Sequence, residues 1–312
     1  MGFKQINALG AKREPFLFIS DFKAKNVEVI PLSELEKYDI EFAINENYSF
    51  KEHPHALRLD AVEYEIYKKK FEYVLEKIRA GETYLLNLTQ ETSIQTALTL
   101  KEMFTLANAH YKLRYKDEFI CFSPEKFVQI KENTIATFPM KGTIDASVKN
   151  AKQKILSDEK EMAEHVMIVD LLRNDLSIVA KGVKVEKFRY ITQIEAGEKK
   201  LLQVSSEISG SLASNWQASL GDILEALLPA GSISGTPKKS TLDIIEDIEG
   251  YERGYFSGVF GVFDGESFDS GVMIRFIEKK GDRLVYKSGG GITLDSDAAS
   301  EYQELQDKIY LP

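Results

Sequence analysis

The sequence predicts an α+β fold with large sheets, and two observations lead to this class. Segments of strand character follow one another in groups instead of alternating singly with helices, which is typical of antiparallel sheets. The 312 residues are 43% apolar, which is enough for a sizeable core, and no linker rich in proline, glycine or serine divides them. We therefore expect one continuous domain, residues 1–312.

The elements of the first half follow from apolar periodicity. Apolar residues at helical spacing, closed by a glycine, predict a helix over 60–81, and a strand follows over 83–94. A helix is expected over 98–112. Two strands with a turn at Glu132 and Asn133 are expected within 118–144, followed by a long helix over about 147–176.

The second half returns to strands over 183–210. Two helices are then expected over 216–229 and 237–250, on either side of a loop rich in glycine and serine. A group of strands is expected over 254–292, and the last helix over 297–310.

Composition excludes several classes of function. The net charge is −9, and no basic run is interleaved with aromatic residues, so we expect no nucleic-acid surface. No apolar run is long enough for a membrane helix and the N-terminus lacks a signal-peptide pattern, so we expect a cytoplasmic protein without membrane contact. The single cysteine, Cys121, excludes an internal disulfide and lies in a strand-like segment, where a core position is expected.

Two predicted helices carry carboxylates three residues apart, Glu161 with Glu164 and Glu301 with Glu304. Residues at this spacing share a helix face, so the four carboxylates could converge on Mg²⁺, which prefers carboxylate oxygens completed by water and substrate. Taken alone, the pattern favours two solvated helix faces. Lys308, one turn beyond Glu304, suits a surface ion pair or a cation near the site.

Two glycine clusters could bring backbone close to a ligand. Gly231 and Gly235 precede Pro237, a helix-start signal, so N–H groups there could face an anion, but the Walker phosphate-loop spacing is absent and we reject ATP binding. The second cluster is Gly289–Gly291. Taken singly, each of these glycine loops is more often a turn than a ligand site. Arg275, in an apolar strand, faces inward to an acidic partner or outward at an edge.

The stretch "TFPMKGTID" places Lys141 between an apolar run and a Gly-Thr step. An ordinary lysine amine is protonated at neutral pH and is no nucleophile. Burial near another cation would lower its pKa and create one. A solvated charge at a strand edge remains the alternative.

Eight segments in this order resemble the chorismate-utilising enzymes, and the aminodeoxychorismate synthase component I branch in particular. They are "SPEKF", "PMKGT", "AEHVMIVDLLRND", "PAGSISGTPK", "GYFSGVFG", "MIRF", "GGGI" and "SEYQELQDK". The resemblance covers residues 60–312 and implies two large, mostly antiparallel sheets packed as a sandwich with helices outside. Residues 1–60 would be a shortened N-terminal segment, which puts tryptophan feedback in doubt.

The resemblance also implies residue roles. Glu164 and Glu304 would hold Mg²⁺, with Glu161 and Glu301 beside them, and Glu125 would be the general acid. Substrate would be bound by Gly142, Thr143, Tyr255, Arg275, Gly289, Gly290, Gly291, Ile292 and Lys308. Lys141 would distinguish the aminodeoxychorismate branch, because anthranilate, isochorismate and salicylate synthases typically have alanine there. Leu85 stands where isochorismate and salicylate synthases have a lysine base, and Gln203 stands where many relatives have histidine.

The implied activity is Mg²⁺-dependent amination of chorismate at carbon 4, a transferase step towards 4-aminobenzoate and folate. Ammonia would come from solution or from a glutamine amidotransferase subunit, since no glutaminase motif surrounds Cys121. The alternatives are anthranilate synthase component I, a non-catalytic chorismate-binding homologue, and an unrelated Schiff-base enzyme using Lys141.

Overall fold

The strands form two antiparallel sheets. The computed structural model describes residues 2–44, 57–196 and 199–312. The nine-stranded sheet runs in the order β10 (Met140–Asp145), β12 (Lys199–Ser211), β9 (Thr134–Thr137), β8 (Lys126–Lys131), β15 (Phe268–Val272), β14 (Val259–Phe263), β1 (Phe16–Ser20) and β2 (Val27–Pro31), with β11 (Lys181–Ala196) pairing β12. The eight-stranded sheet runs in the order β13 (Gly235–Thr236), β5 (Leu85–Gln95), β17 (Arg283–Ile292), β16 (Phe276–Lys280), β7 (Phe119–Ser123), β6 (Tyr111–Tyr115) and β3 (Ile40–Ile44), with β4 (Arg58–Asp60) pairing β5.

Strand β1 shows how the sheets make a sandwich. All five of its residues are buried, and successive side chains point to opposite faces. Phe16 and Phe18 join the core beneath the helices. Leu17 and Ile19 join a second core with residues of β6, β7 and β16, which belong to the other sheet. The predicted sandwich is therefore confirmed.

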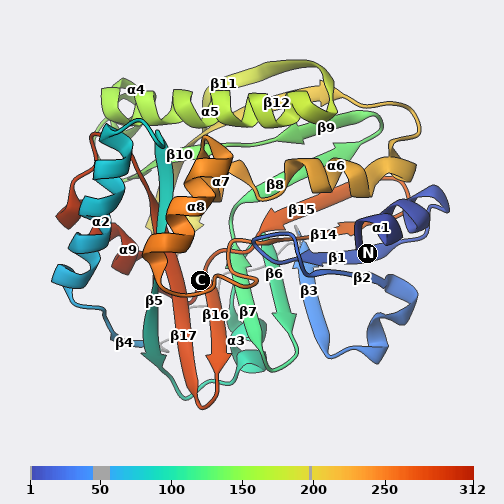
Figure 1. Ribbon diagram of the computed structural model, residues 1–312, viewed down its shortest axis with the longest axis horizontal. Helices are drawn as coiled ribbons and strands as arrows, with labels where there is room; N and C mark the ends of the chain where they lie inside the picture. The colour runs from blue at the N-terminus through green and yellow to red at the C-terminus, as the bar shows by residue number, and fades with distance from the viewer. Residues whose placement is uncertain (1, 45–56, 197–198) are drawn as a thin grey trace.

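The helices cover the outer faces (Figure 1). Their bounds are α1 (Gly2–Ala11), α2 (Tyr64–Arg79), α3 (Leu100–Leu106), α4 (Ala151–Ser157), α5 (Glu159–Val179), α6 (Leu220–Leu227), α7 (Gly231–Ser234), α8 (Lys238–Glu249) and α9 (Ala298–Asp307), with short 3₁₀ helices η1 (Leu32–Lys37) and η2 (Trp216–Ser219). Helix α5 packs on β10, β11 and β12, while α9 packs on α2 and β17. In Figure 1, α5 crosses the top of the view and α2 and α9 lie at the left.

Several predicted elements needed correction. The helix predicted over 98–112 ends at Leu106 because β6 begins at Tyr111, and 118–144 holds four strands, β7 to β10, instead of two. The helix over 147–176 is two helices, since Asp158 caps the start of α5 and interrupts it. Within the strands predicted over 183–210, Gly197 and Glu198 lie outside the described residues. Sequence patterns gave no element before residue 60, where the structure has α1, η1 and β1 to β4.

Candidate active site

The two helices with paired glutamates begin in the same way. Asp158 caps α5 by accepting a hydrogen bond from Glu161 N, and Asp297 caps α9 by accepting from Ser300 N. Glu161 lies in the first turn of α5 and Glu301 in the first turn of α9, where the helix dipole favours negative charge. The predicted placement of both glutamate pairs on helices is confirmed.

Glycines allow these carboxylates to approach the sheets. A Cβ atom at Gly142 in β10 would lie 3.0 Å from Glu161 Oε2, and one at Gly290 in β17 would lie 3.2 Å from Glu301 Oε2. Gly142 also has a φ of +85°, a left-handed conformation that glycine adopts without strain. Glu161 therefore lies against the backbone of Gly142 in one sheet, and Glu301 against the backbone of Gly290 in the other.

Lys141 lies between these acidic groups. Its Nζ is 2.6 Å from Glu164 Oε2, and it is 3.9 Å from the place of a Cβ at Gly291. Burial favours the neutral amine, but attraction by Glu164, together with Glu304 and Glu161, outweighs it and raises the pKa of Lys141. The lowered pKa that burial near another cation would give is not found for Lys141, because the carboxylates around the amine outweigh burial.

Lys308 connects α9 to Gly289–Ile292 at the end of β17, which we call the glycine strand. Its Nζ donates to Glu304 Oε1 at 2.7 Å and to the carbonyl of Gly289 at 2.9 Å. Burial lowers the pKa of Lys308, although Glu304 opposes that effect. The same Lys308 charge, against the effect of burial, lowers the pKa of Glu304. Lys308 is thus part of the site and not a surface ion pair.

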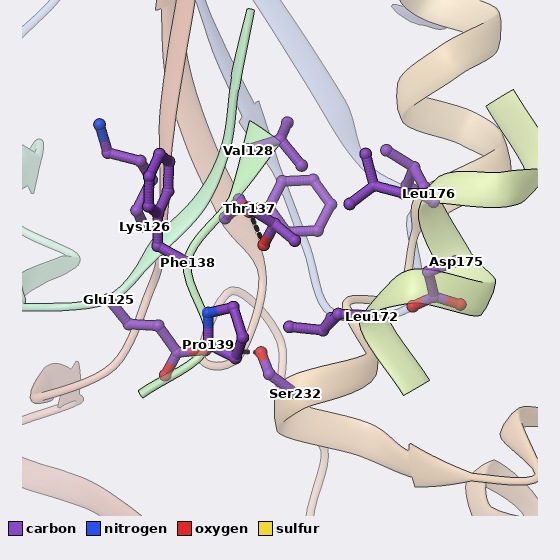
Figure 2. Close-up of a pocket in the computed structure, with 12 residues that line it drawn as sticks. Glu125, Lys126, Val128, Thr137, Phe138, Pro139, Leu172, Asp175, Leu176 and Ser232 are labelled. Carbon is purple, nitrogen blue, oxygen red and sulfur yellow. Dashed lines mark hydrogen bonds between the residues drawn. The ribbon is translucent and has the colours of Figure 1, made fainter. Parts of the chain in front are cut away.

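Glu125 follows β7 and lies partly buried below Pro139 (Figure 2). Burial raises the pKa of its carboxyl, while Ser232 and the charges of Arg275, Lys308 and Lys141 oppose the rise. The raised pKa is what the general-acid prediction required.

Arg275 faces inward, so the outward alternative is excluded. It lies between β15 and β16 and not within a strand, with a left-handed φ of 52°. Its guanidinium lies 5.5 Å from the centre of the Tyr310 ring, and its buried Nε has no hydrogen-bond acceptor among the described residues. Buried donors of this kind are normally satisfied, so this atom is a candidate contact for an anionic ligand.

The strand Gly289–Ile292 offers backbone and not side chains. It pairs with β5 on one side, whereas its pairing with β16 begins only at Lys287. Within the described part of the chain, the opposite edge of Gly289–Ile292 has no strand partner, and apart from the Gly289 carbonyl, which accepts from Lys308, its backbone groups are candidate contacts for a ligand. The Ile292 side chain is fully buried in the core, so only its backbone could contact substrate.

Two further predicted positions lie at the site. The Cδ1 atom of Leu85 lies 3.2 Å from the position that a Cβ atom would take at Gly291. Thr143 is exposed on β10 and pairs with Gln203 of β12, so Gln203 neighbours the Lys141 strand.

The structure does not bring Tyr255 to this group. Its hydroxyl donates to Glu28 Oε1 at 2.9 Å, and its ring stacks on Phe119 in the core between the sheets. The resemblance placed Tyr255 at the substrate carboxylate. We correct that assignment, because the Tyr255 side chain is engaged by Glu28 of β2 and Phe119 of β7 instead.

Sequence reasoning missed Ser232 and misread its loop. Ser232 Oγ donates to Glu125 Oε1 at 2.5 Å, from α7. The Gly231 backbone, expected to face a ligand anion, instead meets Asp175 of α5, whose carboxylate also pairs with Lys238 at 3.4 Å. Figure 2 shows Glu125 and Ser232 at one end and Asp175 at the other end of a cavity of about 20 Å³. No pattern in "PAGSISGTPK" distinguishes Ser232 from its neighbouring serine.

Comparison with known proteins identifies the family. The model of chorismate binding enzymes matches residues 17–311. The chain belongs to this family. An uncharacterized PabA-like protein of Pasteurella multocida is 47% identical to this chorismate-binding enzyme over 99% of the chain and 97% of its own length.

Two relatives with assigned names carry different activities. Anthranilate synthase component 1 of Archaeoglobus fulgidus is 33% identical, over 78% of this chain and 61% of its own length. Aminodeoxychorismate synthase component 1 of Bacillus subtilis is 31% identical, over 78% of this chain and 54% of its own length. These shares are too similar to decide between the two reactions.

Solved structures agree on the fold. Anthranilate synthase component I of Streptococcus pneumoniae superposes with a TM-score of 0.69 at 26% identity, covering 93% of this enzyme and 70% of that chain. The menaquinone-specific isochorismate synthase of Escherichia coli reaches a TM-score of 0.73 at 17% identity, covering 98% and 79%. No helix in the described residues is both long and apolar enough to cross a membrane.

The glutamates also suit the Mg²⁺ that the resemblance implies. As they stand, no three acidic, histidine or cysteine side chains of the described residues enclose a metal position. Mg²⁺, however, commonly takes only one or two carboxylates and completes its shell with water and substrate oxygens. Glu161 Oε2 is buried without a hydrogen-bond partner, and an acidic oxygen left in that state fits a cation ligand. Burial and the neighbouring Glu164 both raise the pKa of Glu161, so a cation would relieve the repulsion.

Proposed function

We propose that this enzyme aminates chorismate at carbon 4, giving 4-amino-4-deoxychorismate. The observation that carries the proposal is the position of Lys141, whose amine lies beside Glu164 and close to the glycine strand Gly289–Ile292. Leu85 supports it, because a buried leucine at the site cannot activate water as a base.

The substrate would lie between the two groups of charge. Mg²⁺ bound by Glu164 and Glu304, with Glu161 and Glu301 beside them, would supply attraction for the ring carboxylate. Arg275 and the backbone of Gly289–Ile292 would bind the enolpyruvyl carboxylate. An enzyme of net charge −9 could bind a dianion in this way because Arg275, Lys308, Lys141 and the bound Mg²⁺ would offset the glutamates of the site locally.

The proposed chemistry has two displacement steps. The neutral Lys141 amine forms a bond to carbon 2, both ring double bonds shift, and the carbon 4 hydroxyl leaves as water with a proton from Glu125. Ammonia then bonds to carbon 4, both double bonds shift back, and the bond from carbon 2 breaks to release Lys141 as the neutral amine. The proton lost by the new ammonium group at carbon 4 restores Glu125. The net reaction consumes chorismate and ammonia and releases aminodeoxychorismate and water. Lys141 must first lose its proton, which requires the charge of Glu164 to be engaged elsewhere.

Ammonia would come from a separate glutamine amidotransferase subunit. Burial raises the pKa of the Cys121 thiol and excludes it from solvent, so this cysteine does not suit a glutaminase nucleophile. The PabA-like naming of the Pasteurella multocida relative supports such a partnership.

Product analysis tests the proposal against anthranilate synthase. Chorismate, Mg²⁺ and an ammonium salt should give aminodeoxychorismate, detected as 4-aminobenzoate once a lyase is added. Fluorescent anthranilate formed without a lyase would assign the enzyme to carbon 2 amination. Chorismate binding without any turnover would identify a non-catalytic homologue.

A further inference from the structure

Arg253 lies behind the candidate site and joins three segments. Its side chain is 2% exposed, and Nε and Nη2 donate to the Glu249 carboxylate at 2.8 and 2.6 Å, at the end of α8. Its Nη1 donates to the carbonyl of Ile233 in α7 at 2.9 Å, and Nη2 donates to the carbonyl of Asn87 in β5 at 2.6 Å. The rigid guanidinium therefore connects α8, α7 and β5.

Neighbouring groups strengthen this connection. Glu249 Oε1 accepts from the backbone N of Thr89 at 2.9 Å and from its hydroxyl at 2.7 Å, which fixes the carboxylate to β5. Asn87 Nδ2 donates to the Ile233 carbonyl at 3.1 Å, so that carbonyl has two donors. Because α7 has only four residues, its carbonyls have few partners within the helix and depend on such outside donors.

Ile233 follows Ser232, whose hydroxyl donates to Glu125. The cavity of about 20 Å³ is lined by both Ser232 and Glu125, so packing there leaves room for Ser232 to move if α7 shifts (Figure 2). Asp175 holds the start of α7 through the Gly231 backbone. Arg253 holds the end of α7 through the Ile233 carbonyl.

We propose that Arg253 is a positioning residue that keeps α7 in place, so that Ser232 stays hydrogen-bonded to Glu125. The consequence for catalysis rests on the proposed role of Glu125 as proton donor. Lysine in place of Arg253 keeps the charge but cannot reach Glu249, Ile233 and Asn87 together, because its single ammonium lacks the planar fork.

The first test measures positioning without using activity. Arg253→Lys should increase amide hydrogen exchange in residues 231–236. The matched control is Arg114→Lys, since Arg114 is also buried and also contacts two carboxylates, Asp39 and Glu41, at β3, which is the opposite edge of the eight-stranded sheet from β13 and β5. That control should change exchange near β3 and β6 and leave 231–236 as in the wild type. Unchanged exchange of 231–236 in Arg253→Lys would overturn the proposal.

The second test measures catalysis. Arg253→Lys should reduce kcat by roughly 10- to 100-fold, as expected for a displaced catalytic group. KM should change less than about threefold, because the residues proposed to bind the carboxylates of the substrate are unchanged. Ser232→Ala should reduce kcat similarly, and the double variant should be no slower than Ser232→Ala alone. Multiplying effects in the double variant, or an effect on KM alone, would contradict the proposal. A wild-type enzyme without carbon 4 amination would instead overturn the proposed function and leave the exchange result standing.

A milder variant covers the case in which Arg253→Lys does not fold. Asn87→Ala removes one donor from the Ile233 carbonyl and keeps the backbone carbonyl that Arg253 contacts. It should show the same two effects at smaller size, with faster exchange of 231–236 and a lower kcat. Wild-type values for both would contradict the proposal.

Discussion

At the scale of single residues, the site depends on a few charges that neutralise one another. Lys141 is paired with Glu164, and Lys308 with Glu304, so each lysine is matched to one glutamate of a helix pair. The sequence could predict the identity of these groups, because glutamates three residues apart share a helix face. It could not predict the direction of the Lys141 pKa shift, which depends on carboxylates that two helices far apart in the sequence bring to the amine.

Lys141→Ala should reduce amination by roughly 1,000-fold or more, because the alanine variant has no nucleophile for carbon 2. The measurement is the rate with chorismate, Mg²⁺ and ammonia. The control is Lys160→Ala, since Lys160 lies 3.8 Å from the same Glu164 but is exposed, and it should be close to wild type. Equal turnover in both variants would remove the covalent route.

The pH dependence of kcat/KM should report Glu125. A general acid must be protonated, so activity is present below its pKa and falls as pH rises through that raised value. Ser232→Ala removes a hydrogen bond that favours the carboxylate, so the fall should move to higher pH. The charges of Arg275, Lys308 and Lys141 remain in that variant. A shift to lower pH would contradict this role of Ser232.

At the scale of elements, capped helices and glycine strands bring the charges together. Sequence patterns located α2, α8, α9 and β5 because their apolar periodicity is strong and their ends are marked by glycine or by turn residues. They failed at α4 and α5, which appeared as one helix because Asp158 was not recognised as a cap. They also placed Arg275 within a strand, whereas it lies in the connection between β15 and β16. The placement of Tyr255 at the substrate came from the resemblance and not from a pattern.

Gly142→Ala should weaken Mg²⁺-dependent chorismate binding by about tenfold, because the new methyl group displaces Glu161. Calorimetric titration of chorismate with varied Mg²⁺ measures it. Gly281→Ala is the matched control, since Gly281 also has a positive φ, of 62°, but open space around it. Both variants should lose about 1–2 kcal/mol of stability from the left-handed conformation, and only Gly142→Ala should affect Mg²⁺. Equal Mg²⁺ dependence in both would contradict the placement of Glu161.

At the scale of the whole molecule, one chain supplies both sheets and all the proposed site residues. The class of fold could be predicted from grouped strands, whereas the strand order could not, because pairing partners far apart in sequence leave no local pattern.

The chain alone should use ammonia and not glutamine. We expect amination with an ammonium salt and none with glutamine, because Cys121 is buried. Cys121→Ala should leave the ammonia-dependent rate within about threefold of wild type, since Cys121 is buried in the core between the sheets, where a small substitution affects stability more than chemistry. Glutamine-dependent turnover by the chain alone would contradict the need for a partner subunit.

The pairing of β1 with β14 has a consequence for biosynthesis. Strand β1, residues 16–20, pairs with β14, residues 259–263. Because β1 is synthesised long before β14, it cannot form this pairing until β14 has been made. During translation, its apolar side chains stay without their final neighbours until most of the polypeptide has left the ribosome. The nascent protein therefore exposes the apolar side chains of β1 for most of its synthesis. We expect chaperones to bind this segment until β14 has been made.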